Sequence, residues 1–252
     1  MSRKRRRVTD EPFLVVRTSA SDHRDGSRIG AHSHGWHQLV HVRSGLTTVR
    51  TPAGTWIAPP TWAVWLPAGA EHELRFTGAS ALRTAYVRPD RAPGGDCRAF
   101  AVSPLLRELL ARTTELGMLD ERDPTEAAVT SLILAELDGA GQAAITLPEP
   151  AGGPTAEAAR LIGEDPAGST TAALARAVGL GVRTLERRFL DDTGLTVGRW
   201  RRQLMLLRGL EVVAAGGTAV AAARAAGYAT PSAWVAAFRS TFGTTPSRWF
   251  TP

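Results

Sequence analysis

The carboxy-terminal third of the chain contains the same sequence unit twice, and this repeat constrains the fold more than any other feature. The first copy reads AALARAVGLGVRTLERRFLDDTGLTVGRW and the second reads VAAARAAGYATPSAWVAAFRSTFGTTPSRWF. Aligning Gly179 with Gly227 also places Phe189 on Phe238, with one residue of slip in the turn. Each copy predicts a short helix, a glycine-containing turn and a second helix, which is the pattern of a helix-turn-helix. Such a unit places its second helix in the major groove of DNA.

The second helix of the first unit, expected over residues 182–191, carries residue types that read DNA bases. Leu185 and Phe189 lie four residues apart and are expected to face the core. The side chains left on its other faces are those of Arg183, Thr184, Glu186 and Arg187. Arginine can bond O6 and N7 of guanine, and glutamate can accept a hydrogen bond from N4 of cytosine. Arg188 and Arg199 are expected to contact phosphates, which fix position rather than sequence. The alternative is a surface helix whose arginines serve solubility.

The second unit is chemically poorer at the matching positions. Its candidates for facing the groove are short or apolar, with one arginine near the helix end: Pro231, Ser232, Val235, Ala236 and Arg239. These side chains can touch a thymine methyl group or a phosphate but little else. Between the units, residues 197–214 predict one helix of about 18 residues, which would span roughly 27 Å. We therefore expect the first unit to supply most base readout and the second mainly to position the domain.

The amino-terminal half has a β pattern. Residues 13–87 contain short, often alternating apolar runs separated by glycine, proline or charged turns. Several short strands at close spacing predict a small sandwich or barrel. Four tryptophans crowd into this segment: Trp36, Trp56, Trp62 and Trp65. Either they line a small-molecule pocket, for which we take Trp36, Trp56 and Trp65 as candidates, or they pack in the core.

Three histidines and a glutamine of the β segment lie in GAHSHGWHQLVHVRSG and in the later LPAGAEH, and they are His32, His34, Gln38 and His72. Their spacing resembles the two motifs of a cupin, and this resemblance makes them a candidate effector and metal site. His32 and His34, two apart, would project from the same side of a strand. Imidazole suits zinc, iron, nickel or copper. The competing interpretation is that these residues line a metal-free pocket or satisfy hydrogen bonds near its mouth. His37 and His41 fall outside the spacing, and we interpret them as surface or pocket residues.

Residues 101–140 switch to helical periodicity. A leucine stripe follows Ser103-Pro104, and a second capping sequence begins at Asp123. This segment either forms a dimer seam or packs against the barrel. Residues 141–154 are rich in glycine and proline and predict an interdomain linker, and residues 155–252 form the second domain. The basic residues 1–12 predict a flexible tail.

Bulk composition sets the cellular setting. No run of about 18 apolar residues occurs, so no membrane span and no membrane partner are expected. Cys97 is the only cysteine, which excludes an internal disulfide and fits a cytoplasmic protein. From residue 155 onward the chain holds 12 arginines and 7 acidic residues, whereas residues 1–154 hold 18 basic and 17 acidic residues. A basic domain beside a nearly balanced one indicates an anionic partner for the former.

Two resemblances extend this interpretation. The spacing His32-x-His34-x3-Gln38 and Pro67-x-Gly69-x2-His72 resembles the two motifs of a cupin. In metal-binding cupins an acid stands where this chain has Gln38, and a neutral glutamine would weaken a divalent site without abolishing it. Residues 170–250 resemble the DNA-binding domain of AraC/XylS-family transcriptional regulators, through Gly227-Tyr228, Phe242-Gly243, Pro246 and Trp249 among others. The resemblance implies a cupin-like β-barrel sensor over residues 13–100, followed by helices and by an all-α domain with two helix-turn-helix units.

The expected function is that of a non-enzymatic transcription regulator. Its implied partners are double-stranded promoter DNA and a small-molecule effector, with RNA polymerase and a second copy of the chain as further candidates. No cofactor is required by this interpretation, although a divalent metal at the histidines remains open. The rival is a cupin-type metal-dependent enzyme, a dioxygenase or an isomerase, with an appended helical domain; it needs a metal with an open coordination position.

Overall fold

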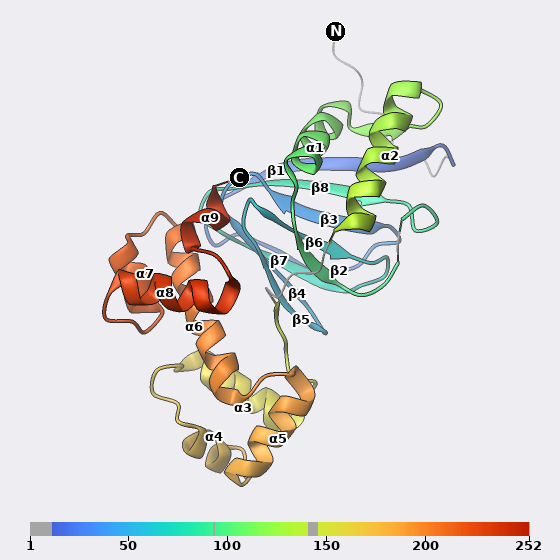
Figure 1. Ribbon diagram of the computed structural model, residues 1–252. Helices are drawn as coiled ribbons and strands as arrows, with labels where there is room; N and C mark the ends of the chain where they lie inside the picture. The colour runs from blue at the N-terminus through green and yellow to red at the C-terminus, as the bar shows by residue number, and fades with distance from the viewer. Residues whose placement is uncertain (1–11, 93, 141–145, 252) are drawn as a thin grey trace.

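The computed structural model describes residues 12–92, 94–140 and 146–251, which form a strand-rich domain followed by a helical one (Figure 1). Residues 1–11 of the predicted tail and residues 141–145 of the predicted linker lie outside the described residues. The strands form two antiparallel sheets, of order β10-β1-β8-β3-β6-β9 and β11-β5-β4-β7-β2. The strands are β1 (Leu14–His23), β2 (Arg28–His32), β3 (His37–Val42), β4 (Leu46–Thr51), β5 (Gly54–Ala58), β6 (Trp62–Leu66), β7 (His72–Thr77), β8 (Ser80–Val87), β9 (Arg98–Ala101), β10 (Met118–Asp120) and β11 (Thr146–Leu147).

The two sheets pack face to face because alternate side chains of strands such as β3, β6 and β7 are apolar and point inward. Val40, Val64 and Phe76, all without exposed surface, belong to this inner layer. The cupin-like strand domain expected from the sequence is confirmed, in the form of a sandwich rather than a closed barrel, since each sheet keeps two edge strands in the hydrogen-bonding order. The architecture is an open pair of cupin-like sheets.

The outer face of the six-stranded sheet is covered by α1 (Pro104–Leu116) and α2 (Pro124–Gly139), as Figure 1 shows. Ser103 and Asp123 cap these helices as the sequence predicts. Of the leucine stripe, Leu106, Leu109 and Leu110 are buried against the sheet, whereas Leu105 is 46% exposed. The stripe therefore packs mainly against the strand domain.

The helical domain contains α3 (Gly153–Glu164), α4 (Thr171–Ala177), α5 (Val182–Thr193), α6 (Val197–Ala214), α7 (Ala219–Ala225), α8 (Pro231–Phe242) and α9 (Pro246–Phe250). Helices α4 and α5 form the first predicted unit and α7 and α8 the second, with α6 between them (Figure 1). Gly179 and Gly227 adopt φ values of 68° and 74° in the two turns, a conformation that favours glycine. The prediction of two helix-turn-helix units joined by one long helix is confirmed. None of the helices within the described residues has the length and apolar character that crossing a membrane requires.

The described part of the predicted linker, residues 146–154, contains secondary structure that the sequence did not indicate. Residues 146–147 form β11, which pairs with β5, and the Nε1 of Trp200 on α6 donates to the carbonyl of Pro148 at 2.7 Å. The apolar core of the helical domain extends to Leu46, Ile57 and Leu147 of the strand domain. The reason is that the outer face of the five-stranded sheet is apolar here, so the helical domain buries it.

Candidate functional sites

Helix α5 presents two arginines on one exposed face. Leu185 and Phe189 are fully buried, which fixes the rotation of the helix. Arg183 and Arg187, four residues apart, are both exposed, and so is Arg188. Thr184 is half-buried beside them. An exposed arginine pair on the second helix of a helix-turn-helix is placed to reach base edges in the major groove.

Glu186 does not share that role in the geometry observed. Its Oε2 accepts a hydrogen bond from the backbone N–H of Val197 at 3.2 Å, and the side chain is half-buried. Val197 is the first residue of α6, where a backbone N–H has no acceptor inside the helix. A carboxylate at this end also interacts favourably with the helix dipole. The prediction that Glu186 reads a base is therefore at odds with the structure, in which it anchors α6 to α5.

The second unit shows the opposite arrangement at the matching positions. Val235 stands where the first unit has Glu186, and Pro246, which carries no N–H, stands where the first unit has Val197. Since proline leaves no donor to satisfy, an apolar residue can face it. Both residues of the Glu186–Val197 hydrogen bond therefore differ in the second unit.

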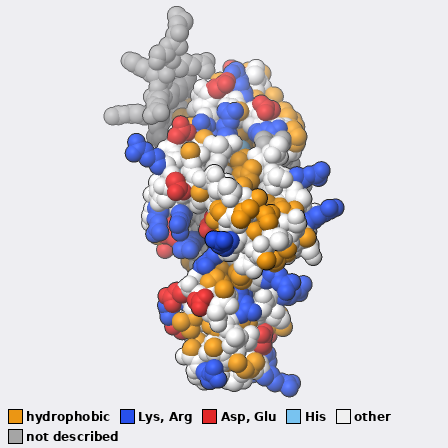
Figure 2. All heavy atoms as spheres, turned by 90° about the vertical axis from the view of Figure 1, so that its left-hand side faces the viewer, with side chains coloured by type: hydrophobic (Ala, Val, Ile, Leu, Met, Phe, Trp, Pro, Cys, Tyr) orange, Lys and Arg blue, Asp and Glu red, His pale blue; other side chains and the backbone are white. Residues whose placement is uncertain are grey.

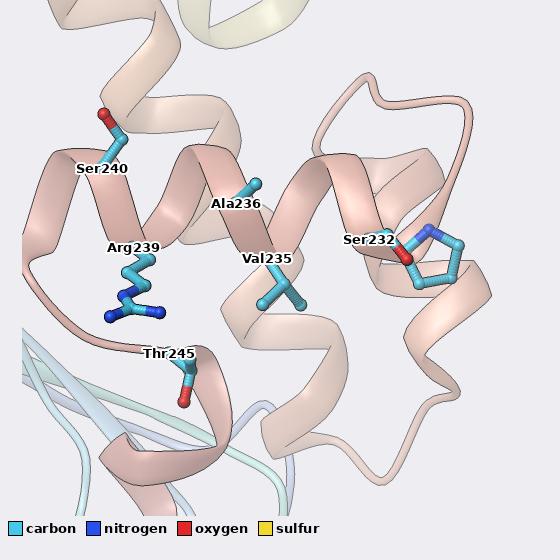
Figure 3. A pocket seen from close by; sticks show the side chains of 7 residues that line it. Ser232, Val235, Ala236, Arg239, Ser240 and Thr245 are labelled. Carbon is cyan, nitrogen blue, oxygen red and sulfur yellow. The ribbon is translucent and has the colours of Figure 1, made fainter.

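Helix α8 lines a groove of about 730 Å³. Figure 3 shows the side chains along it: Ser232, Val235, Ala236, Arg239 and Ser240 from α8, with Thr245 opposite. Ser232, Ala236 and Arg239 are exposed, while Val235 is half-buried. Arg239 is the only charged residue in this lining, so the groove has little with which to distinguish bases.

Arginines of α6 line a second groove, of about 550 Å³, together with the turn of the second unit. Arg199 is exposed there, in keeping with a phosphate contact, whereas Arg201 donates to the carbonyl of Ser169. Figure 2 views the side of the molecule that carries α7 and α8 in Figure 1. Apolar side chains gather in the middle of that face, and arginines are scattered around them.

In the strand domain, three histidines converge at one end of the sandwich. His32 ends β2, and His72 begins β7 directly opposite. His34 was expected on the same strand as His32 but lies in the loop after β2. The ring centroids of His32 and His72 lie 4.3 Å apart, and those of His34 and His72 lie 5.1 Å apart. One ligating nitrogen from each ring lies within 4.8 Å of the others.

The hydrogen bonds of the three rings define which nitrogen carries a proton. Each Nδ1 faces a backbone carbonyl oxygen two residues away: Gly30 at 2.8 Å from His32, Trp36 at 2.7 Å from His34, and Ala70 at 2.9 Å from His72. A carbonyl oxygen only accepts, so each Nδ1 donates and, in the neutral ring, each Nε2 keeps a lone pair. The Nε2 of His72 is buried and makes no hydrogen bond within the described residues. Burial lowers the pKa of His72 to about 4, opposed by the bond to Ala70, with a smaller lowering from the other two histidines.

Gln38 adds a fourth lone pair. Its amide nitrogen donates to the hydroxyl oxygens of Thr84 at 2.9 Å and Tyr86 at 3.3 Å. The hydroxyl proton of Thr84 is already donated to the carbonyl of Leu39, so Thr84 can only accept, which fixes the amide orientation. The Oε1 of Gln38 consequently faces the Nε2 of His34 at 2.9 Å. Two acceptors at this distance require a proton or a cation between them.

The tryptophans proposed for the pocket separate into three places. Trp36 is half-buried near this end of the sandwich, with the guanidinium of Arg17 at 4.3 Å from its ring. Trp56 lies in the apolar layer between the sheets. The pocket prediction for Trp65 is wrong, because this side chain points to the other face of its sheet and packs in the cluster that includes α1 and α2. His37 contacts Trp65 on that face, and His37 and His41 are buried rather than at the surface.

Sequence reasoning missed three residues near the histidines: Arg17, Thr84 and Tyr86. The Tyr86 ring lies 5.1 Å from the His34 ring and 5.2 Å from the Arg17 guanidinium. Burial raises the pKa of Tyr86, and the charge of Arg17 opposes this shift. No local pattern marks these residues; the signal is the pairing of β3 with β8, which places Tyr86 opposite Gln38.

Comparison with known proteins shows which family the chain belongs to. A family model described as an AraC-like ligand binding domain matches residues 15–139, and one described as a helix-turn-helix domain matches residues 174–251. The chain belongs to the AraC family and is a DNA-binding transcription regulator with an amino-terminal ligand-binding domain.

One relative and two solved structures illustrate the similarity. The HTH-type transcriptional regulator NimR of Escherichia coli strain K12 is 27% identical over 220 residues, which is 86% of this chain and 81% of that protein. ToxT from Vibrio cholerae, crystallised with an unsaturated fatty acid, matches at 11% identity and a TM-score of 0.39 over 94% of this chain and 95% of its own. An AraC-type DNA-binding domain protein from Chromobacterium violaceum matches at 23% identity and a TM-score of 0.36, over 38% of this chain and 88% of its own.

Proposed function

We propose that this regulator reads its operator mainly through α5 and takes its effector at the histidine end of the sandwich, where a divalent metal forms part of the site. The DNA part rests on the asymmetry between the two units. Arg183 and Arg187 are exposed on α5, while α8 offers Arg239 and otherwise short or apolar side chains to its groove. Arg188 and Arg199 supply phosphate contacts that hold the domain in register.

The metal part rests on the convergence of lone pairs at His32, His34 and His72. Histidines that bind metal typically donate their other N–H to a carbonyl or carboxylate, as all three rings do here. Neighbouring ligands at about 2.1 Å from a tetrahedral ion lie roughly 3.4 Å apart, and the ligating nitrogens of the three histidines lie within 4.8 Å of one another. The residues present therefore fit a divalent ion. When bound, the ion would supply a Lewis acid to which an effector atom can bind.

In this proposal the residues around the ligands orient them and hold them in place. Thr84 and Tyr86 orient Gln38, the three backbone carbonyls hold the rings, and the effector is bound without being turned over. The supporting observation is the family, whose members regulate transcription. Such a regulator would act in the cytoplasm, on promoter DNA and beside RNA polymerase. Homodimerisation would use α1 and α2, where Leu105 and Leu132 are 46% and 45% exposed.

Two experiments test the proposal separately. Gel-shift titration of the full chain against DNA upstream of its own gene should give binding that is selective for sequence and falls steeply with salt. Binding that is indifferent to sequence would contradict the DNA part. Equilibrium dialysis against zinc or cobalt should give one ion per chain, lost in His72→Ala and kept in His23→Ala, a control outside the cluster. Equal uptake by both variants would contradict the metal part.

A further inference from the structure

The ligand set at the histidine end carries no negative charge. The group assembled from the described residues consists of His32, His34 and His72, and the side chain nearest to it in the hydrogen-bond network is the neutral amide of Gln38. Glu71, which precedes His72, is exposed and outside this group. A divalent ion held by three neutral imidazoles and one amide would keep its full charge. Desolvating such a charge is costly unless a counter-charge is present.

A second positive charge lies beside the site. The guanidinium of Arg17 lies against the rings of Trp36 and Tyr86, at 4.3 Å and 5.2 Å from their centroids. The Tyr86 ring also contacts the histidine cluster, because it lies edge to face against the ring of His34. Tyr86 also accepts from the amide of Gln38. Arg17 is therefore held by aromatic rings that belong to the same network as the proposed ligands.

We propose that the effector of this regulator is a small carboxylate, which binds the metal through one carboxylate oxygen while Arg17 contributes the second positive charge. This inference rests on the proposed metal site and specifies the chemical class of its effector. A carboxylate on the effector supplies the negative charge that the neutral side chain of Gln38 lacks. Trp36 and Tyr86 offer apolar surface to the remaining part of the effector, because both side chains are only half-buried. Guanidinium groups bind carboxylates with paired hydrogen bonds, which adds orientation to the charge.

The test compares matched acids and amides on cobalt-loaded protein. Benzoate and butanoate are titrated against benzamide and butanamide, with the visible cobalt spectrum and tryptophan fluorescence as readouts. The expected result is that each acid binds at least about tenfold more tightly than its amide, which corresponds to about 1.4 kcal/mol. Its binding should change the cobalt spectrum. Equal affinities for acid and amide would overturn the inference while leaving the metal site intact.

The variant Gln38→Glu makes two predictions of opposite sign. A carboxylate at this position should raise metal affinity, since it adds a charged ligand, and should lower benzoate affinity at least tenfold, since the counter-charge is already supplied. Arg17→Gln should weaken benzoate binding and leave cobalt uptake unchanged. If Gln38→Glu bound benzoate as tightly as the wild type, the charge argument would be wrong. Failure of the wild type to take up cobalt or zinc would instead sink the metal site itself, and this inference with it.

Discussion

Glu186 offers the sharpest test of how the first unit works, because sequence and structure assign it different roles. Replacing it by alanine removes the acceptor for the N–H of Val197 at the start of α6. Loss of a side chain that satisfies a helix N-terminus costs about 0.5–2 kcal/mol. The side chain is only half-buried, so solvent screens part of the interaction and we expect about 1 kcal/mol. Such a loss lowers the melting temperature of a cooperative unit of 150–250 residues by about 2–4 °C.

The assay measures stability and base preference on the same variants. Urea unfolding should show the loss for Glu186→Ala and a smaller one for Glu186→Gln, which keeps an oxygen acceptor. Binding to a set of operators with each base changed in turn should show the same preferences as the wild type. The control is Arg187→Ala, one residue away and exposed, for which stability should hold and preference at one base should relax. A Glu186→Ala protein of unchanged stability that no longer discriminates at one base pair would refute the anchoring role.

Three further changes give independent checks. Arg199→Ala should weaken binding to all DNA sequences alike and reduce the slope of log affinity against log salt by about one, and a change in base preference would count against it. Gly209→Ala should destabilise the protein by about 1–3 kcal/mol in urea, because the added Cβ would lie 2.8 Å from an indole ring of α8, whereas Gly198→Ala on the same helix has open space and should not. His41, whose pKa is lowered to about 4 mainly by burial, also bonds a backbone carbonyl that opposes the shift. Since its folded pKa lies below the unfolded value, the wild type should lose about 2 kcal/mol from this group between pH 7 and pH 5, a loss absent in His41→Gln, and identical pH profiles would refute it.

Strands whose own residues show an alternating or apolar pattern could be predicted from the sequence. Strands that form only because they pair with a neighbouring strand could not. The segments that form β3 to β8 alternate or are continuously apolar, so one buried face shows in the sequence. Strand β2 is largely exposed, and β10 and β11 are three and two residues long. All three are edge strands, and their formation depends on the inner strands β7, β1 and β5 with which they pair. The same long-range pairing leaves the sheets open, which no local run of residues could indicate.

The candidate sites divide in the same way. The convergence of His32, His34 and His72 was implied by the resemblance of their spacing to the cupin motifs, and the structure brings the three residues together at one end of β2 and β7. The roles of Arg17 and Tyr86 depend on how distant strands pair, which spacing does not encode. For Glu186 the repeat itself held a signal. The second unit has Val235 in place of Glu186, and it has Pro246, which carries no N–H, in place of Val197.

Strand β7 connects the two sites through the backbone. It begins at His72 in the proposed effector site, and the turn that follows it places Gly78 against the carbonyl of Ala214 at the end of α6. A Cβ on Gly78 would lie 2.0 Å from that oxygen, so the two segments are in close backbone contact. The charge of Arg75, on the same strand, also acts on Glu211 of α6, whose pKa is raised by burial. Packed interfaces tend to switch between discrete arrangements rather than deform continuously. An effector that binds His72 with different affinity in two arrangements of β7 would therefore shift how α6 holds the two DNA-binding units.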